Sequence, residues 1–180
     1  VGVSGSSYRR EKCLELMKII HPTCIRGNYS EIQALLHNCG TVTGVDAAED
    51  ALAEAEETDL PELMKQYAKE NQMILVASGE TDLITDGSCV YRCHNGSPMM
   101  ARITGSGCMS TVMLGAFLSA ENSVESAVAC CAFTGIAGEL AAKEMTAQKR
   151  GTMTFRNWFI DAVSLMTPEQ LEHGTDVDWF

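Results

Sequence analysis

The stretch I-T-G-S-G-C-M-S-T-V-M-L-G-A-F, from Ile103 to Phe117, is where the strongest signals of this sequence meet. Gly105 and Gly107 flank Ser106, Cys108 follows directly, and an apolar run with small residues comes next. Glycines in front of an apolar run predict a loop that leads into a helix. We therefore expect a glycine-rich turn at residues 105–108, followed by a buried helix.

A turn of this kind can bind an anion. The first N–H groups of a helix lack partners within the helix, its dipole is positive at this end, and glycines let a phosphate approach the main chain. The same field favours the thiolate form of a cysteine, so Cys108 is a candidate reactive group. The pattern matches neither G-x-x-x-x-G-K-[ST] nor G-x-G-x-x-G, and an ordinary tight turn also fits it. From these residues alone, both interpretations stay open.

Three segments together resemble the hydroxyethylthiazole kinases of the ribokinase-like superfamily. The turn at 105–108 resembles the family's G-[ST]-G-C anion-hole motif, where most relatives in the superfamily carry G-x-G-D. I-R-G-N-Y-S-E (Ile25–Glu31) resembles R-G-N-x-x-E, and A-S-G-E-T-D-L-I-T-D-G (Ala77–Gly87) resembles T-G-E-x-D-x-[IV]-[ST]-D-G. The motifs stand in the family's order, and the resemblance is dense from Val1 to about Phe117.

The sequence pattern and the resemblance predict an α/β fold of the ribokinase-like type, with a mostly parallel sheet and helices on both faces. In the first part of the chain we expect an amphipathic helix at 8–20, a strand at 23–26 with Arg26 at its end, an exit loop at 27–30, and a helix at 31–38 capped by Asn28 or Ser30. A solvated element at 40–58, a helix from Asp59 to Asn71, a strand at 73–77 and a hairpin of strands at 83–85 and 90–93 should follow. After the glycine turn and its helix we expect a long helix at 123–145, a tail from 152, a helix at 158–165 and a last turn from Thr167.

At 180 residues the chain lies in the single-domain range. Its opening V-G-V-S-G resembles the family's D-P-V-G-A-G-A segment from the third residue onward. The resemblance thus implies a single ribokinase-like domain over residues 1–180 that lacks its N-terminal portion. We expect these residues alone not to form a competent kinase.

The reaction that the resemblance implies is the transfer of the γ-phosphoryl group of ATP to the hydroxyl of 4-methyl-5-(2-hydroxyethyl)thiazole, a step in thiamine salvage. The thiazole alcohol and ATP are then the small-molecule partners. Cys108 would be the catalytic residue and would take the proton from the substrate hydroxyl. Gly105, Ser106 and Gly107 would form the anion hole, with Gly105 also in contact with the substrate.

Four further residues receive roles from the other two motifs. Arg26 and Ser78 resemble the ATP ligands of the family, and Asn28 and Glu31 resemble its N-x-x-E motif, which organises Mg²⁺, with Glu31 acting through water. Because ligands of open α/β sheets bind beyond the carboxyl ends of strands, these positions suit the chemistry. The residues alone equally allow Arg26 to be a surface charge and Glu31 a carboxylate that complements a helix dipole.

Two alternatives differ in class. A cysteine hydrolase with Cys108 as nucleophile would need a histidine base, and none of the candidates, His21, His37, His94 and His173, stands in a recognised motif. A non-catalytic remnant of the kinase family would keep the fold without the reaction.

Composition limits the partners and the compartment. Thirteen Lys and Arg against 24 Asp and Glu give a net charge of −11, and we find no basic run, so we expect no nucleic-acid and no membrane partner. The eight cysteines form no C-x-x-C motif, which argues against zinc, and most lie in apolar patterns, as reduced core residues of a cytoplasmic protein do. The resemblance further implies a homotrimer.

Overall fold

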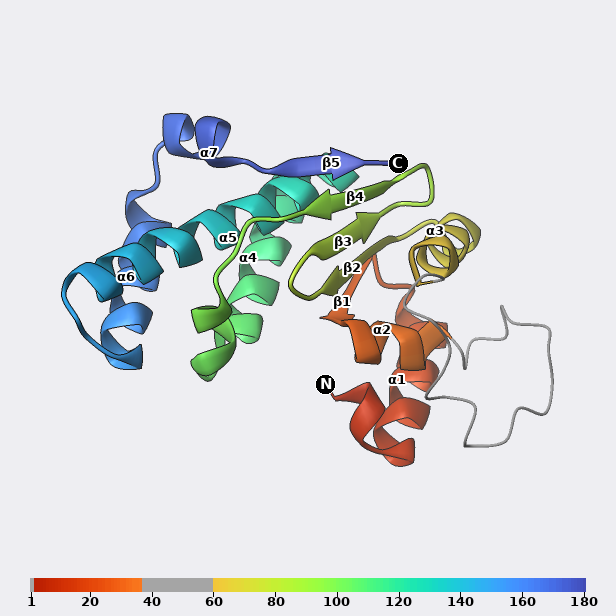
Figure 1. The fold of residues 1–180 in the computed structure, drawn as a ribbon. Helices are drawn as coiled ribbons and strands as arrows, with labels where there is room; N and C mark the ends of the chain where they lie inside the picture. The colour runs from red at the N-terminus through yellow and green to blue at the C-terminus, as the bar shows by residue number, and fades with distance from the viewer. Residues whose placement is uncertain (1, 37–59) are drawn as a thin grey trace. The chain divides into compact units, whose positions relative to one another are not determined.

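The structure of the chain, a computed structural model, describes residues 2–36 and 60–180. In chain order the elements are η1 (Val3–Gly5), α1 (Ser7–Ile20), β1 (Cys24–Asn28), α2 (Tyr29–Leu36), α3 (Leu60–Asn71), β2 (Ile74–Ser78), β3 (Asp82–Thr85), β4 (Val90–Cys93), η4 (Pro98–Arg102), α4 (Ser106–Ala120), α5 (Val124–Ala147), α6 (Thr152–Leu165), α7 (Pro168–Gly174) and β5 (Val177–Trp179) (Figure 1). The strands form one sheet in the order β1-β2-β3-β4-β5. The predicted α/β class is confirmed.

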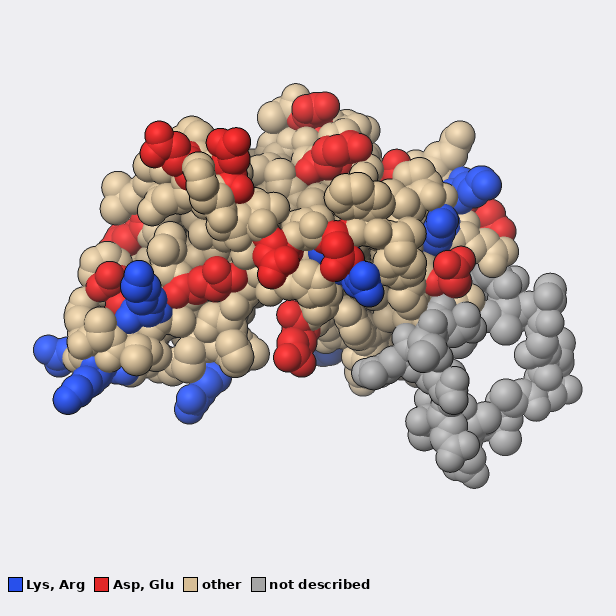
Figure 2. Space-filling view, turned by 45° about the horizontal axis from the view of Figure 1, so that its top comes forward, with Lys and Arg blue, Asp and Glu red and all other residues tan. Residues whose placement is uncertain are grey.

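The chain divides into two compact units. The first unit comprises Val1–Gly79 and Thr85–Val90, and the second comprises Glu80–Ile84 and Tyr91–Phe180. Acidic side chains outnumber basic ones on the face drawn in Figure 2, as the net charge requires. The element predicted at 40–58 and the expected cap Asp59 lie outside the described residues.

A parallel strand pair is the centre of the first unit. β1 pairs with β2 from Cys24 opposite Ile74 to Asn28 opposite Ser78. The run I-L-V-A of β2 is buried throughout, as expected of a strand covered on both faces. The predicted strand at 73–77 is therefore confirmed to within one residue at each end. The helix α3, also predicted, buries Leu60, Met64, Tyr67 and Ala68 at helical spacing.

The connection between β1 and α2 differs from the prediction. The strand does not end at Arg26 but continues to Asn28, and α2 begins at Tyr29 without a loop. The parallel ladder extends this far because Gly27 pairs with Ala77 and Asn28 with Ser78. The predicted exit loop at 27–30 is wrong. A sequence pattern marks where apolar residues end, whereas backbone pairing decides where a strand ends.

The predicted amphipathic helix at 8–20 and the helix predicted after the glycine turn both form, as α1 and α4, but they stay largely exposed. No residue of α1 is buried, and the side chain of Ile19 is 75% exposed. In α4, which we expected to be buried, only Ser110 and Leu114 are buried, and Val112 is 73% exposed. Helical periodicity predicts a helix but not how much of it is covered. In α4, Met109 and Met113 pack against the core of the second unit, while Val112 is exposed.

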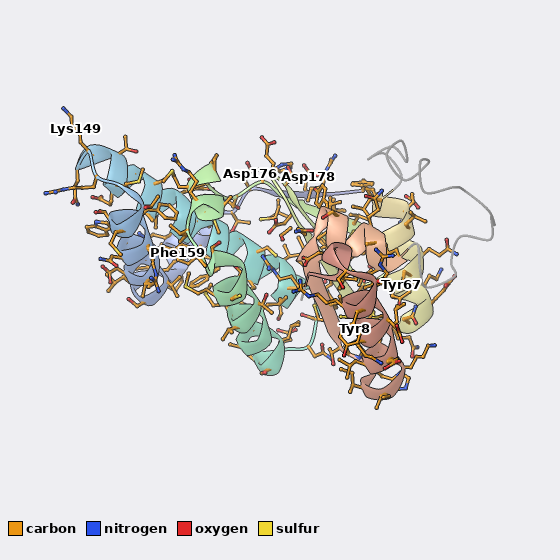
Figure 3. All side chains as sticks on the ribbon, turned by 90° about the horizontal axis from the view of Figure 1, so that it is seen from below. Tyr8, Tyr67, Lys149, Phe159, Asp176 and Asp178 are labelled. Carbon is orange, nitrogen blue, oxygen red and sulfur yellow. The ribbon has the colours of Figure 1, made fainter. Side chains whose placement is uncertain are left out.

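The core of the second unit lies between α5 and α6. Ile103, Ala137, Ala141, Phe155 and Phe159 form one buried cluster, and Phe159 lies among these helices in Figure 3. The long helix predicted after the Ser123 cap is confirmed as α5, with Ser126 N donating to Ser123 Oγ at 3.2 Å. By length and composition α5 could cross a membrane, yet 61% of its most apolar window is buried, as in the core helix of a globular protein.

The C-terminal third contains two corrections. Residues 152–165 form one helix, α6, rather than a tail followed by a helix at 158–165. The last turn predicted at Thr167 is confirmed as α7, with a capping box between Thr167 and Gln170. β5 was not predicted, because three residues are too few for a periodic pattern. It pairs antiparallel with β4, Tyr91 opposite Trp179 and Cys93 opposite Val177.

An ion-pair cluster fastens β5 to β4. Asp178 Oδ1 accepts a hydrogen bond from Arg92 Nε at 2.6 Å, and Asp178 Oδ2 lies 2.9 Å from His94 Nε2. The hydrogen bond from His94, followed by that from Arg92, holds the pKa of the Asp178 carboxyl below its ordinary value. Since the pKa is lower in the folded chain than in the unfolded one, this contribution is present above the ordinary aspartate pKa and is lost as the pH falls through the lowered value.

The change Arg92→Gln should raise the pKa of Asp178 towards its ordinary value, because one charge-assisted hydrogen bond is lost. NMR titration of the Asp178 carboxyl carbon measures this shift, and Asp161, an exposed aspartate on α6, serves as the control. An unchanged titration midpoint of Asp178 would show that Arg92 does not stabilise the carboxylate in solution.

The turn before β4 requires glycine at residue 87. Gly87 has φ +96°, and a Cβ there would lie 2.5 Å from Lys69 Cβ and 2.6 Å from Lys69 Cα. We expect Gly87→Ala to lower the free energy of unfolding by about 2 to 4 kcal/mol, from backbone strain and a clash with α3 together. Urea unfolding beside Gly151→Ala, where a Cβ meets nothing within 4 Å, is the measurement. Equal stability of the two variants would contradict the prediction.

Candidate functional site

The N-Y-S-E segment, Asn28 to Glu31, folds into a capping box at the end of β1. Asn28 Oδ1 accepts hydrogen bonds from Glu31 N at 2.8 Å and from Ser30 Oγ at 2.9 Å. In return, Glu31 Oε2 accepts from Asn28 N at 3.0 Å. Such reciprocal bonds satisfy donors that the first turn of a helix leaves without partners. The predicted cap Asn28 is confirmed, and the box fixes the Glu31 carboxylate at the carboxyl end of β1.

The other oxygen of Glu31 reaches a distant part of the first unit. Glu31 Oε1 accepts from Gly2 N at 2.9 Å, so this carboxylate joins the N-terminal glycine and serine segment to the β1–α2 junction. A Cβ at Gly27 would lie 3.0 Å from Glu31 Cβ, which shows how closely the side chain packs over the strand. Main-chain N–H groups therefore donate to both oxygens of the Glu31 carboxylate.

The donor set around Glu31 fits Mg²⁺ bound through water. Mg²⁺ in nucleotide sites keeps several waters and is held through one or two carboxylates. A carboxylate that Gly2 N and Asn28 N fix in place, as they do that of Glu31, suits a water of such a shell. Direct coordination by a protein cage does not fit, since the described residues contain no group of three or more His, Cys, Asp or Glu able to hold a metal.

Ser78 lies beside this box. The register of the parallel pair places Ser78 opposite Asn28, and Ser78 Oγ donates to Gly27 O at 3.2 Å. Arg26 lies two residues before Asn28 on β1, opposite Val76, and strand alternation puts Arg26 and Asn28 on the same face. The carboxyl end of the strand pair thus brings together Asn28, Glu31 and Ser78. Arg26 lies two residues earlier on β1.

The glycine turn lies in the second unit and has the geometry of a helix N-terminus open to a ligand. Gly105 is the N-cap of α4 with φ +96° and ψ −4°, and no side chain caps the helix. Its first turn contains no acidic residue, and a Cβ on Gly105 would have nothing within 4 Å. The turn therefore offers main-chain donors at the positive end of a helix dipole with open space beside Gly105.

Local hydroxyl groups hold the shape of this turn. Ser106 Oγ donates to Ile103 O at 3.4 Å, Ser110 Oγ to Ser106 O at 2.9 Å, and Thr111 Oγ1 to Gly107 O at 2.9 Å. Ile103 itself belongs to the core cluster of the second unit, so the residue that leads into the turn is held by core packing. The hydroxyls engage carbonyl oxygens, which leaves the main-chain N–H groups as the polar groups that an anion would meet.

Cys108 is the third residue of α4 and its side chain is exposed. The hydrogen bonds of His94 and His173 go to Asp178, Thr81 and the carbonyl of Glu169, and His37 lies outside the described residues. The described part of the second unit thus offers Cys108 no histidine base of the kind that a cysteine hydrolase needs.

Comparison of the fold with solved structures defines the class of protein. The structure of hydroxyethylthiazole kinase protein from Pyrococcus horikoshii OT3 matches with a TM-score of 0.81 at 24% identity, and the match covers 100% of this chain and 63% of that one. At this identity the likeness shows the fold, which is the ribokinase-like α/β fold.

Sequence comparison goes further. The model of the hydroxyethylthiazole kinase family matches residues 1–169. Hydroxyethylthiazole kinase 1 of Methanosphaera stadtmanae is 38% identical over 171 residues, covering 91% of this chain and 60% of that protein. Hydroxyethylthiazole kinase of Staphylococcus carnosus is 36% identical, covering 91% and 59%. The chain belongs to the hydroxyethylthiazole kinase family and spans about 60% of the length of these relatives.

Proposed function

We propose that the protein transfers the γ-phosphoryl group of ATP to the hydroxyl of 4-methyl-5-(2-hydroxyethyl)thiazole in thiamine salvage. The observation that carries this proposal is the uncapped glycine turn at the start of α4, with Gly105 at positive φ and open space at its Cβ position. Membership of the hydroxyethylthiazole kinase family supports the choice of reaction. In the described part of the second unit, the hydrogen bonds of His94 and His173 go to groups other than Cys108, so no observation there favours the cysteine hydrolase over the phosphotransferase.

Phosphoryl transfer needs positioning and charge stabilisation more than covalent chemistry. The N–H groups of Ser106, Gly107 and Cys108 would donate to the oxygens of the transferring phosphoryl group, and their dipoles are already oriented before the substrate arrives. Cys108 would accept the proton of the thiazole alcohol as the alcohol oxygen bonds to the γ-phosphorus and the bond from that phosphorus to the leaving ADP breaks. Because the thiol is exposed at the same helix terminus, one turn supplies both the donors and the base.

The β1–α2 junction would handle the nucleotide phosphates. Arg26 would offset phosphate charge, and the hydroxyl of Ser78 would donate to a phosphate oxygen in exchange for its bond to Gly27 O. Asn28 and Glu31 would hold water around Mg²⁺, which supplies neutralisation of the developing negative charge when bound. The capping box sets these two side chains in place without ligand, so little ordering is needed on binding.

The remaining expectations concern organisation. We propose that residues 1–180 form part of one ribokinase-like domain, that the active enzyme is a homotrimer, and that it works in the cytoplasm. The thiazole alcohol and Mg·ATP are its small-molecule partners. The similarity to kinases named for hydroxyethylthiazole supports the choice of these small-molecule partners, whereas the trimer and the cytoplasmic location follow from the family resemblance alone.

A product assay tests the reaction. The 180-residue chain and the protein at the full length of its relatives are each incubated with Mg·ATP and the thiazole alcohol, and ³¹P NMR follows the phosphate ester. We expect product from the full-length protein, none from the 180-residue chain, and none from 4-methyl-5-ethylthiazole, which lacks the hydroxyl. A full-length protein that binds Mg·ATP but forms no ester would refute the proposed reaction.

A further inference from the structure

Asn95, just after β4, is a hydrogen-bond junction of the second unit. Its Oδ1 accepts from Asp176 N at 2.8 Å, and its Nδ2 donates to Gly174 O at 2.8 Å and to Glu139 Oε1 at 3.1 Å. One side-chain amide therefore joins three segments, namely the end of β4, helix α5 and the chain between α7 and β5. Figure 3 labels Asp176 of that last segment close to Asp178 of β5.

Neighbouring backbone bonds reinforce the junction. His94 N donates to Asp176 O at 2.9 Å, and Gly96 N donates to Glu139 Oε1 at 2.8 Å. The carboxylate of Glu139 thus accepts from both Asn95 and Gly96, and it holds the chain at the point where it leaves β4. Residues 94–96 are fixed on one side by α5 and on the other by the segment at 174–176.

Two glycines of α5 make room for the chain that follows. A Cβ at Gly135 would lie 2.5 Å from Asn95 Cβ and 2.6 Å from its carbonyl carbon. Three residues on, a Cβ at Gly138 would lie 2.5 Å from Met100 Sδ. Residues three apart lie on the same face of a helix. Because Gly135 and Gly138 have no side chains, residues 95–100 can pack closely against this face of α5.

From this junction a chain of short-range hydrogen bonds reaches the glycine turn. Met100 N donates to Ser97 O at 2.9 Å and Ile103 N to Met100 O at 3.5 Å, and Ser106 Oγ donates to Ile103 O at 3.4 Å. Ile103 is also buried in the core against α5 and α6 residues. The segment between Gly96 and Gly105 contains η4, and Ile103 at its end is buried, so a displacement at Asn95 would reach the start of α4 through this segment.

We propose that Asn95, held by Glu139 and by the 174–176 segment, is a positioning residue for the anion turn at 105–108. The 174–176 segment lies beyond residue 169, where the match to the family model ends. The C-terminal segment, which contacts no substrate in the proposed reaction, thereby contributes to phosphate binding. The expected effect of Asn95 on the affinity for Mg·ATP rests on the proposed function. Its effect on the order of the turn at 105–108 can be measured without nucleotide.

The test compares Asn95→Ala with Asn157→Ala, a matched change at an exposed asparagine of α6. Hydrogen exchange is measured without nucleotide at the amides of residues 103–110 and 174–179, and the Kd of Mg·ATP is measured by calorimetry. In Asn95→Ala we expect exchange at both segments to rise about 10-fold and the Kd to rise about 10-fold, since several hydrogen bonds are lost. Asn157→Ala should leave all three quantities unchanged.

A second pair of variants covers the case in which Asn95→Ala does not fold. Glu139→Gln keeps the acceptor oxygen and should leave exchange at 103–110 near the wild-type value, whereas Glu139→Ala removes it and should raise the exchange. If the residue had a purely structural role, its loss would lower global stability, and hydrogen exchange would rise equally in both segments and in the core of α5. The exchange of α5 amides therefore serves as an internal control.

The outcomes separate the two claims. If the 174–179 amides exchange faster in Asn95→Ala while those at 103–110 and the Kd stay at wild-type values, the positioning role is refuted. If the wild-type chain binds no Mg·ATP, but exchange at 103–110 rises in Asn95→Ala and Glu139→Ala, the proposed function fails and the positioning role stands.

Discussion

Replacing Cys108 with alanine should lower kcat for thiazole phosphorylation by about 10²- to 10⁴-fold, the range expected when a general base is removed. The expectation follows from the exposed thiol at the third residue of α4, beside the N–H groups that would bind the transferring phosphoryl group. The Kd of Mg·ATP should change little, because the main-chain donors remain. Steady-state kinetics on the full-length protein, together with calorimetry, measure the two effects separately.

The matched variant is Cys108→Asp. Most relatives in the ribokinase-like superfamily carry aspartate at the corresponding turn position, so a carboxylate should serve as base and retain turnover. A dead Cys108→Asp variant, together with a covalent adduct trapped on the Cys108 thiol, would instead identify a nucleophilic cysteine and overturn the kinase mechanism.

Replacing Gly105 with valine should raise the Kd of Mg·ATP at least about 100-fold, comparable to the loss of a main-chain anion site. Gly105 has φ +96°, a conformation that a β-branched residue adopts only with strain. Valine would either turn the first N–H groups of α4 away from the ligand or place its side chain in the open space beside the turn. Calorimetric titration with Mg·ATP measures the effect.

Gly115→Ala is the control for this change. Gly115 lies on the same helix, and a Cβ there meets nothing within 4 Å, so alanine should leave the Kd unchanged and slightly favour the helix. Thermal unfolding of both variants shows whether valine at residue 105 unfolds the chain. A folded Gly105→Val variant with wild-type affinity for Mg·ATP would show that the nucleotide phosphates do not bind at this turn.

Features set by neighbouring residues could be predicted from the sequence. The Asn28–Glu31 capping box needs only a four-residue segment, the buried strand β2 needs only the apolar run after Met73, and the turn at Gly105 needs only its glycines. Each depends on contacts within a few residues, which a pattern can encode. For the same reason the long helix α5 and the last turn from Thr167 were predicted correctly.

Features set by distant residues could not be predicted in this way. β5 pairs with β4, more than 80 residues away in the chain, and its three residues carry no pattern of their own. The Asn95 junction likewise joins residues that only the fold brings together. The clustered glycines Gly135 and Gly138, three apart in an otherwise apolar helix, were the one visible signal that another segment crosses α5 closely.

Burial was the other limit. The apolar residues of α1 and α4 predicted helices correctly, yet Ile19 and Val112 are largely exposed. An amphipathic pattern identifies a face, and the partner that covers it is a property of the assembled protein.

NMR mapping of Mg·ATP binding tests the central claim most directly. Amide spectra of the isotope-labelled chain are recorded as Mg·ATP is added, with magnesium chloride alone as the control. The account predicts the largest shift changes at the amides of Ser106, Gly107 and Cys108, with further changes at Asn28 and Glu31, and no comparable change on α6. Saturable shifts confined to other residues, or none at millimolar Mg·ATP, would contradict it.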